Sequence, residues 1–314
     1  MNKTILLVGC GQIGFRHLQA SLNTKQIKNI DILEKVDISN DVSLLIRSSK
    51  KNIQYFKNFN KLKKNYDLLI FSTTSKYTYP IFKKLSKKIS FKKVLFEKIT
   101  FSKIDHYKKT NKILLDKNIK AWVDCSSRYQ KFFNFIKRKI SNKLKMTMIS
   151  ESLNDNFISN FVHLHDIFNF IINTTVSKVI TLKVDSIFNS KRKGYYDIEG
   201  EALIRSNNGS VFYTKNKNTG SYFQQRFYFV QKNKLIQALF KDYKINVKVK
   251  YNNKKVETYN FKYELQSVLS KEIILDIFSN KSKLINFKNY SKIQMDILNW
   301  AYFNLKNKKK INFT

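Results

Sequence analysis

A glycine-rich turn close to the beginning of the chain constrains the fold more than any other feature of the sequence. An apolar run over residues 5–8 predicts a short buried strand, and Gly9, Gly11 and Gly14 follow it before an amphipathic helical pattern. Gly9 permits a tight turn, Gly11 lets the backbone approach a pyrophosphate, and Gly14 lets helix and strand pack closely. The order of strand, turn and helix therefore predicts a dinucleotide site in which the backbone N–H groups at the helix start hold the pyrophosphate.

An acidic residue follows at the distance that such a site requires. Glu34 lies twenty residues beyond Gly14 and directly follows a second predicted strand over residues 29–33. A carboxylate at that place can accept hydrogen bonds from both ribose hydroxyls, and it repels the 2′-phosphate of NADP. The expected cofactor is therefore NAD or NADP, with NAD favoured, although the neighbouring Lys35 partly offsets the repulsion.

Strand and helix patterns continue to alternate through the first part of the chain. Strands are expected at 52–56, 67–72, 93–99 and 119–124, and helices at 41–50, from about Pro80 to 89, at 102–118 and at 130–140. Pro80 is expected just inside its helix, where a missing N–H has no consequence, and Ser102 is expected to cap the next helix. The alternation predicts an α/β fold with a doubly wound, parallel Rossmann sheet, and it places Thr73 and Thr74 at the cofactor-binding edge.

The alternation stops near residue 143, and a different architecture is expected beyond it. A strand at 144–151 and a helix at 160–172 are followed by seven strands between residues 178 and 261, then by helices at 264–278 and 290–305. This order predicts an α+β domain whose mostly antiparallel sheet is covered by helices on one face. The predicted domains are residues 1–125 and 126–314. Frequent Tyr, Phe and Ile in the strands predict a homo-oligomer, a dimer or tetramer, formed through the open face.

The charge of the chain suggests a polyanionic partner when it is considered alone. The formal net charge is +38, but only seven of the 60 basic residues are Arg, which nucleic-acid recognition favours along with Lys. Lys is spread along the whole chain together with abundant Asn, Ile, Phe and Tyr, which is typical of A/T-rich codons. We therefore expect no nucleic-acid partner, and a basic nucleic-acid-binding protein is the least favoured alternative.

The same sequence makes a membrane partner unexpected. No apolar run reaches membrane-spanning length. Cys10 and Cys125 form neither a metal-binding spacing nor a disulfide framework, and both are expected to be small buried residues in a reducing compartment. The expected location is the cytoplasm.

Two of the four histidines lie together in the predicted helix at 160–172. His163 and His165 are followed directly by Asp166, a combination that can bind zinc. On a helix, however, the two imidazoles point about 200° apart, and no cysteine or distant third ligand accompanies them. We therefore expect no metal site. From the residues alone two interpretations remain: both histidines belong to the core, or one of them is catalytic.

These motifs together resemble the Gfo/Idh/MocA family of nicotinamide-dependent oxidoreductases over nearly the whole chain. The matching segments are Gly9 to His17 around the glycine turn, Ser72 to Ser75, Glu97-Lys98, and Ser127 to Tyr129. The resemblance implies an NAD(P)-dependent dehydrogenase that transfers a hydride to or from a hydroxyl or ketone carbon of a sugar or sugar nucleotide.

The resemblance also implies roles for individual residues. His163 falls on the family's catalytic histidine and is the expected general base, with Asp166 orienting its ring. Lys98 is expected to hydrogen-bond the same substrate oxygen and to stabilise its developing charge. Motifs and resemblance together give these expected cofactor contacts: Gly9, Gly11, Gln12, Ile13, Gly14, Glu34, Ser72, Thr73, Thr74, Glu97, Lys98 and Arg128.

Three positions depart from the family pattern. Ile99 replaces the proline that follows the lysine, Thr78 stands where the family often has a histidine, and Asn160 or Ser159 stands where it has an acid. The alternative function is therefore a protein of the same fold that binds the nucleotide with lost or reduced turnover.

Overall fold

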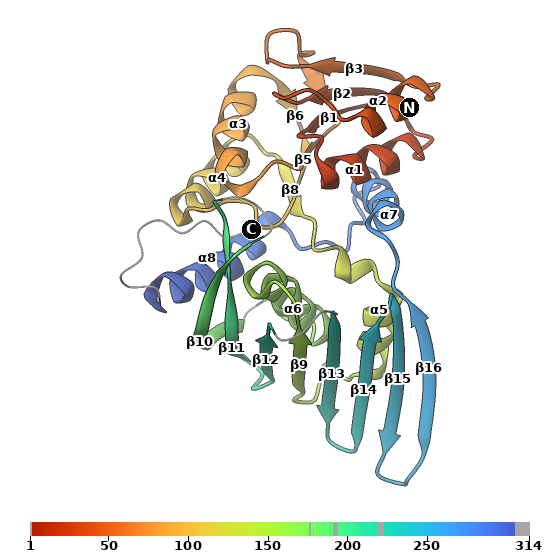
Figure 1. Ribbon diagram of the computed structural model, residues 1–314, viewed down its shortest axis with the longest axis vertical. Coiled ribbons are helices and arrows are strands. Elements are labelled where there is room, and N and C mark those ends of the chain that lie inside the picture. Colours follow the sequence, from red (N-terminus) through yellow and green to blue (C-terminus); the bar gives the residue numbers. More distant parts are fainter. Residues whose placement is uncertain (1, 176, 191–193, 219–222, 305–314) are drawn as a thin grey trace. The chain divides into compact units, whose positions relative to one another are not determined.

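The structure is a computed structural model that describes residues 2–175, 177–190, 194–218 and 223–304 (Figure 1). It divides into two compact units, Met1–Ser126 with Leu265–Tyr290, and Ser127–Glu264 with Ser291–Thr314. This division differs from the predicted domains, because the segment 265–290 returns to the first unit. There, helix α7 (Gln266–Phe278) packs beside helix α1 (Gln12–Leu22).

The first unit contains a six-stranded parallel sheet, and this confirms the predicted doubly wound fold. The strand order is β3-β2-β1-β5-β7-β8, so the chain winds outward in both directions from β1. The strands are β1 (Lys3–Val8), β2 (Ile27–Leu33), β3 (Asn52–Phe56), β5 (Leu68–Phe71), β7 (Lys93–Phe96) and β8 (Lys120–Val123). A separate two-stranded parallel sheet, β4 (Asn65–Tyr66) with β6 (Ser90–Phe91), was not predicted.

Helices cover both faces of the parallel sheet. Figure 1 shows α1 with α7 on one side and α3 (Ser75–Lys88) with α4 (Ile104–Asp116) on the other, and α2 (Asn40–Arg47) follows β2. Two local predictions are wrong. Helix α3 begins soon after β5, so Pro80 lies in its second turn and not at its start. Helix α4 begins after Lys103, which makes no side-chain cap, so Ser102 is not the cap.

The second unit contains an eight-stranded sheet in the order β10-β11-β12-β9-β13-β14-β15-β16. Only the β12–β9 pair is parallel, which confirms the predicted, mostly antiparallel sheet. The strands are β9 (Thr147–Leu153), β10 (Ser177–Asn189), β11 (Tyr196–Ser206), β12 (Val211–Lys217), β13 (Gln224–Gln231), β14 (Lys234–Lys241), β15 (Lys244–Tyr251) and β16 (Val256–Lys262).

Helices α5 (Lys131–Lys139) and α6 (Phe157–Ile171) pack on one face of this sheet (Figure 1). A short 3₁₀ helix, Ser126–Tyr129, precedes α5, and helix α8 (Phe287–Asn304) contains the boundary between the units at residue 290. In β15, buried Ile245, Val247 and Val249 alternate with exposed residues, as expected for a sheet with one packed face. The homo-oligomer through the other face stays a prediction.

No helix in the part of the chain that the structure describes is both long enough and apolar enough to cross a membrane.

Candidate functional site

Five neighbouring strands of the first unit end in one register at the carboxyl edge of the sheet. Their last residues pair with one another across the sheet: Leu33, Val8, Phe71, Phe96 and Val123. In a doubly wound sheet this edge binds the ligand. The residues that directly follow the strands are therefore brought into one row, although they come from separate sequence motifs: Glu34, Gly9, Ser72, Glu97 and Asp124.

The three glycines of the turn have different spatial requirements. Gly9 has a φ of +90°, and a Cβ there would lie 2.9 Å from Thr73 Cγ2. A Cβ on Gly14 would lie 2.3 Å from the Gly9 carbonyl oxygen, so backbone packing excludes any side chain. A Cβ on Gly11 would meet no atom within 4 Å. Gly9 and Gly14 are thus required by the fold, whereas Gly11 borders open space where a ligand can lie.

The start of α1 is suited to an anion. Gly11 is the N-cap and offers no side-chain acceptor, and the first turn contains no acidic residue. The backbone N–H groups of Gln12 and Ile13, in this first turn, have no acceptor one helical turn before them, and the helix dipole adds partial positive charge. The predicted pyrophosphate contacts therefore have the expected chemistry.

The Glu34 carboxylate lies against the same turn. Its Oε2 accepts a hydrogen bond from the Cys10 backbone N–H at 2.8 Å, and its Oε1 accepts one from the Lys35 N–H at 2.8 Å. These contacts fix the carboxylate beside the glycine turn and leave it lone pairs for further donors. Burial, reinforced by the Glu34 charge, raises the pKa of the Cys10 thiol to about 12, so Cys10 is a protonated thiol and not a nucleophile.

The loop after β5 supports the turn from the other side. Ser72 Oγ donates to the Gly9 carbonyl oxygen at 2.6 Å. The hydroxyl of Thr78, which replaces the family's histidine, is buried, lies 2.9 Å from Thr73 Oγ1 and donates to the carbonyl of Thr74 at 3.1 Å. Thr78 therefore holds the loop together and does not face a ligand, while Ser72 braces the glycine turn.

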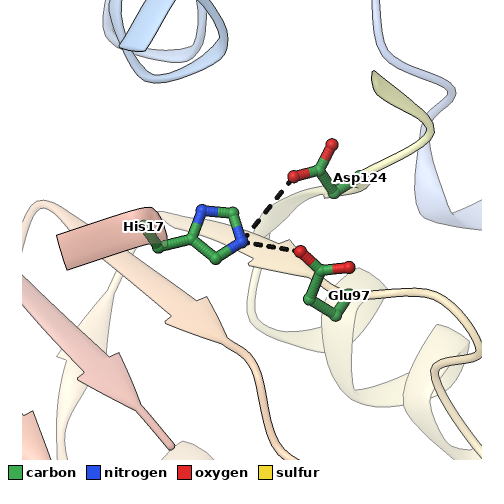
Figure 2. Close-up of side chains that lie close together, drawn as sticks. All are labelled: His17, Glu97 and Asp124. Carbon is green, nitrogen blue, oxygen red and sulfur yellow. Dashed lines mark hydrogen bonds and ion pairs between the residues drawn. The ribbon is translucent and has the colours of Figure 1, made fainter. Parts of the chain in front are cut away.

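A cluster that the sequence did not predict lies at the same edge. His17 of α1 is fully buried, and its Nε2 lies 2.7 Å from Glu97 Oε1 and 3.7 Å from Asp124 Oδ2 (Figure 2). Asp124 Oδ2 also accepts a hydrogen bond from the Gln266 side-chain amide at 2.8 Å. A usable signal was present in the sequence, because Glu97 and Asp124 lie at the ends of adjacent predicted strands and His17 belongs to the glycine-turn motif.

The charges of this cluster shift one another's pKa values. Burial lowers the pKa of the His17 imidazole, but the hydrogen bond and charge of Glu97, with the charge of Asp124, outweigh burial and raise it overall. Burial, together with the Glu97 charge, raises the pKa of Asp124 to about 7. The imidazolium form of His17 thus donates its Nε2–H to Glu97, while Asp124 titrates near neutrality.

Among the described residues, His17, Glu97 and Asp124 are the group whose ligand atoms gather closely enough to hold a metal ion, within 4.8 Å of one another. The 2.7 Å separation between His17 Nε2 and Glu97 Oε1 is a hydrogen-bond distance. In this geometry a hydrogen bond joins His17 to Glu97.

Lys98 follows this cluster directly. Its side chain is half-buried, and the next residue, Ile99, is 5% exposed and joined to Lys98 by a cis peptide bond. Thr100 Oγ1 donates to the Glu97 carbonyl at 3.0 Å, which fixes the backbone on both sides of Lys98.

In the second unit, helix α6 carries the predicted His163 and Asp166. His163 is half-buried, whereas His165 is fully buried with its Nε2 at 2.6 Å from Ser177 Oγ. Burial lowers the pKa of His165 to about 3, so this residue is a neutral core histidine. The two histidines therefore differ in environment on one helix, and the general-base role of His163 stays a prediction.

Asp166 has a partner other than the one predicted. Its two carboxylate oxygens accept hydrogen bonds from Arg128 Nη2 at 2.6 Å and Arg128 Nε at 2.8 Å. Burial raises the pKa of Asp166, and Arg128 opposes that shift. Arg128, predicted as a cofactor contact, is thus bound to α6 by a bidentate ion pair. Asn160, in place of the family's acid, donates its side-chain amide to Asp155, a carboxylate in the loop before the helix.

No family model matches the sequence, and a search of curated proteins finds no relative. Solved structures show that the chain has the two-domain fold of Gfo/Idh/MocA-type dehydrogenases, which confirms the resemblance at the level of the fold. One of them is an oxidoreductase from Agrobacterium radiobacter in complex with NAD⁺, L-tartaric acid and magnesium, with a TM-score of 0.74 and 16% identity over 99% of this chain and 98% of that chain.

Two further similar structures have different named activities. UDP-N-acetylglucosamine 3-dehydrogenase GnnA from Acidithiobacillus ferrooxidans matches with a TM-score of 0.73 and 11% identity over 97% of each chain. The transcriptional regulator Gal80p from Kluyveromyces lactis matches with a TM-score of 0.72 and 11% identity over 99% of this chain and 94% of that chain. The fold is therefore shared by named dehydrogenases and by a regulator.

Proposed function

We propose that this chain is an NAD(P)-dependent oxidoreductase that transfers a hydride to or from the hydroxyl or ketone carbon of a sugar or sugar nucleotide. The observation that carries the proposal is the glycine turn. Gly11 borders open space, the start of α1 has no side-chain cap, and the Glu34 carboxylate lies beside the turn. Together these features fit a pyrophosphate followed by a ribose.

Different residues of the first unit would bind different parts of the cofactor. Gly11, Gln12 and Ile13 would hold the pyrophosphate through backbone N–H groups, and Glu34 would accept hydrogen bonds from the ribose hydroxyls. The negative charge of Glu34 favours NAD over NADP. When bound, the nicotinamide supplies the acceptor or donor of the hydride.

The side chains of the protein must remove the hydroxyl proton and stabilise the negative charge that develops on the substrate oxygen. Oxidation of a secondary alcohol releases a proton from oxygen, and a half-buried imidazole such as His163 suits its removal near neutral pH. The Lys98 ammonium would hydrogen-bond a substrate oxygen and stabilise negative charge that develops there. Asp166 would act on His163 only indirectly, because both of its oxygens accept hydrogen bonds from Arg128.

The proposed substrate class has separate support. One structurally similar protein is named as a dehydrogenase of UDP-N-acetylglucosamine, and another comes from the biosynthesis of gentamicin A and was solved with NAD. Both share the fold with this chain at 9–11% identity, so the substrate is proposed as a class and not as a compound.

NADH binding by fluorescence titration tests the cofactor proposal through a matched pair of glycine variants. Gly11→Val places a branched side chain in open space, so thermal unfolding should change little while NADH affinity falls at least about tenfold, because the side chain fills the pyrophosphate position. Gly14→Ala should instead lower the stability of the fold, since its Cβ would lie 2.3 Å from a backbone oxygen. Unchanged NADH affinity in a folded Gly11→Val variant would contradict the proposal.

A second candidate function is a nucleotide-binding protein of the same fold without turnover, like a regulator. Two points favour it: the resemblance puts Asn160 or Ser159 where the family has an acid, with Asn160 hydrogen-bonded to Asp155, and Gal80p shares the fold. A steady-state assay with saturating NAD over a panel of sugars and sugar nucleotides separates the two functions. NADH binding without turnover of any panel member favours the regulator-like function, and turnover excludes it.

A further inference from the structure

The buried imidazole of His17 connects the helix that follows the glycine turn with the segment that carries Lys98. His17 lies in α1, the helix whose first turn follows Gly11, and its Nε2 contacts Glu97, the residue that precedes Lys98. His17 is fully buried, and the Glu97 side chain is 13% exposed. The contact therefore joins the glycine-turn helix to the main chain that carries Lys98, and solvent does not compete strongly for it.

The second carboxylate of the cluster is held from elsewhere in the same unit. Asp124 Oδ2 lies 3.7 Å from His17 Nε2 and accepts a hydrogen bond from Gln266 of α7 at 2.8 Å. Gln266 Oε1 in turn accepts one from Ser126 Oγ at 2.9 Å. Gln266 thus holds Asp124 from α7, and the Glu97 side chain interacts with both His17 and Asp124.

The cluster is not a fully satisfied structural network. His17 Nδ1 and Asp124 Oδ1 are buried and make no hydrogen bond. The same unit contains a buried carboxylate that is fully satisfied, because Asp31 accepts hydrogen bonds from Lys63 Nζ at 2.9 Å and from the Tyr66 hydroxyl at 2.7 Å. Buried polar atoms without partners are rare in folded proteins and often mark functional sites. The His17 cluster thus keeps unmet hydrogen-bonding capacity, as do other buried side chains of the described residues, His165 among them.

We propose that His17 is a positioning residue for Lys98: its hydrogen bond to Glu97 fixes the backbone from which Lys98 projects, and its positive charge offsets the carboxylate next to Lys98. The proposal rests on the proposed oxidoreductase function for its meaning, but the contact itself is a property of this chain. Thr100 fixes the same segment from the other side through the Glu97 carbonyl. His17 and Thr100 thus hold Glu97, the residue that precedes the lysine, by its side chain and by its carbonyl.

The chemical reactivity of Lys98 tests this without a known substrate. Trace acetylation with acetic anhydride, read by mass spectrometry, compares Lys98 with the exposed Lys83 in each sample. His17→Gln leaves the Glu97 charge uncompensated beside Lys98, which stabilises the ammonium, so acetylation at pH 8 should be at least about threefold slower. Glu97→Gln removes that charge, so acetylation should become faster than in the wild type.

Tyr66→Phe is the matched control, because it removes a buried hydrogen bond from the same unit without touching the cluster. Its Lys98 acetylation should equal that of the wild type even if its thermal stability falls. If His17→Gln does not fold, the opposite response of Glu97→Gln still decides the question. Wild-type acetylation rates in both variants would overturn the positioning role, whereas failure of the wild type to bind NADH would overturn the proposed function separately.

Discussion

Each unit buries one histidine completely, and the two units hold their imidazoles in opposite states. In the first unit, His17 Nε2 meets the Glu97 carboxylate at 2.7 Å, with Asp124 close by, and its pKa is raised. In the second unit, His165 Nε2 meets the neutral Ser177 hydroxyl at 2.6 Å, and its pKa falls to about 3. Equal burial therefore accompanies a raised imidazole pKa in one unit and a lowered one in the other.

The difference comes from the partners of the two rings, because burial lowers the pKa of both. Burial alone disfavours the imidazolium in both units. In the first unit two carboxylates reverse this preference. In the second unit the Ser177 hydroxyl donates its hydrogen bond to the Asn169 side-chain oxygen at 2.6 Å and so accepts the one from His165 Nε2. The carboxylates lie at the carboxyl edge of the parallel sheet, and the hydroxyl belongs to Ser177, a half-buried residue at the start of β10.

The largest expected effect is a difference in turnover between variants of His163 and His165, the two histidines of α6. His163→Ala should reduce turnover at least about a hundredfold, since loss of a general base typically reduces rates by about 10²–10⁴, while NADH affinity stays nearly unchanged. His165→Ala should reduce turnover far less, because its ring is neutral and committed to Ser177. Steady-state kinetics on the first active panel substrate provides the measurement. An inactive His165→Ala beside an active His163→Ala would reverse the proposed roles.

The next effect compares the two buried histidines directly. His17→Leu leaves the buried Asp124 and the half-buried Glu97 without their imidazole partner and should lower the free energy of unfolding by about 3–5 kcal/mol. His165→Leu removes a neutral ring whose partner Ser177 keeps its hydrogen bond to Asn169, so the loss should be about 1–2 kcal/mol. Equal losses would show that the charge difference between the units is unimportant for stability.

The two tryptophans allow each unit to be followed separately in that experiment. Trp122 lies in β8 of the first unit and Trp300 in the part of α8 assigned to the second unit. Urea unfolding of variants that also carry Trp300→Phe or Trp122→Phe therefore reports one unit at a time. His17→Leu should shift the Trp122 transition more than the Trp300 transition.

Most of the fold could be predicted from the sequence because its signals are local. Short apolar runs such as Leu68–Phe71, set between helical patterns, favour buried strands between two helical layers, and alternating strands such as β15 imply a sheet with one packed face. The errors at Pro80 and Ser102 concern where helices begin, which depends on how the preceding loop leaves the sheet. The return of α7 to the first unit is a tertiary effect with no local signal.

The candidate site was predictable only where one motif contains all of its parts. The glycine turn and Glu34 follow from spacing, because a single strand–turn–helix unit positions them. The His17–Glu97 contact joins residues 80 positions apart, and the bidentate Arg128–Asp166 pair joins residues 38 apart. Both contacts depend on the sheet register and on helix packing. The sequence therefore singled out these residues but did not predict which of them contact one another.

The smallest expected effect is a pair of opposite pH slopes in the two units. Asp124 titrates near pH 7 in the folded state against 3.8 as its ordinary value, so the folded state binds a proton that the unfolded state lacks, and this stabilisation is lost as pH rises from about 4 to 7. The raised pKa of His17 acts in the same direction above pH 6.5. His165 behaves oppositely: below pH 6.5 the unfolded chain binds a proton that the folded ring does not bind until about pH 3, so stability is lost as pH falls.

Asp124→Asn should therefore reduce the loss of stability with rising pH that Trp122 reports. His165→Leu should reduce the loss of stability with falling pH that Trp300 reports. Each change should amount to at least about 1 kcal/mol across its window, measured by urea unfolding from pH 4 to 8. Parallel slopes for the two reporters would mean that the carboxylates do not reverse the preference of the first imidazole.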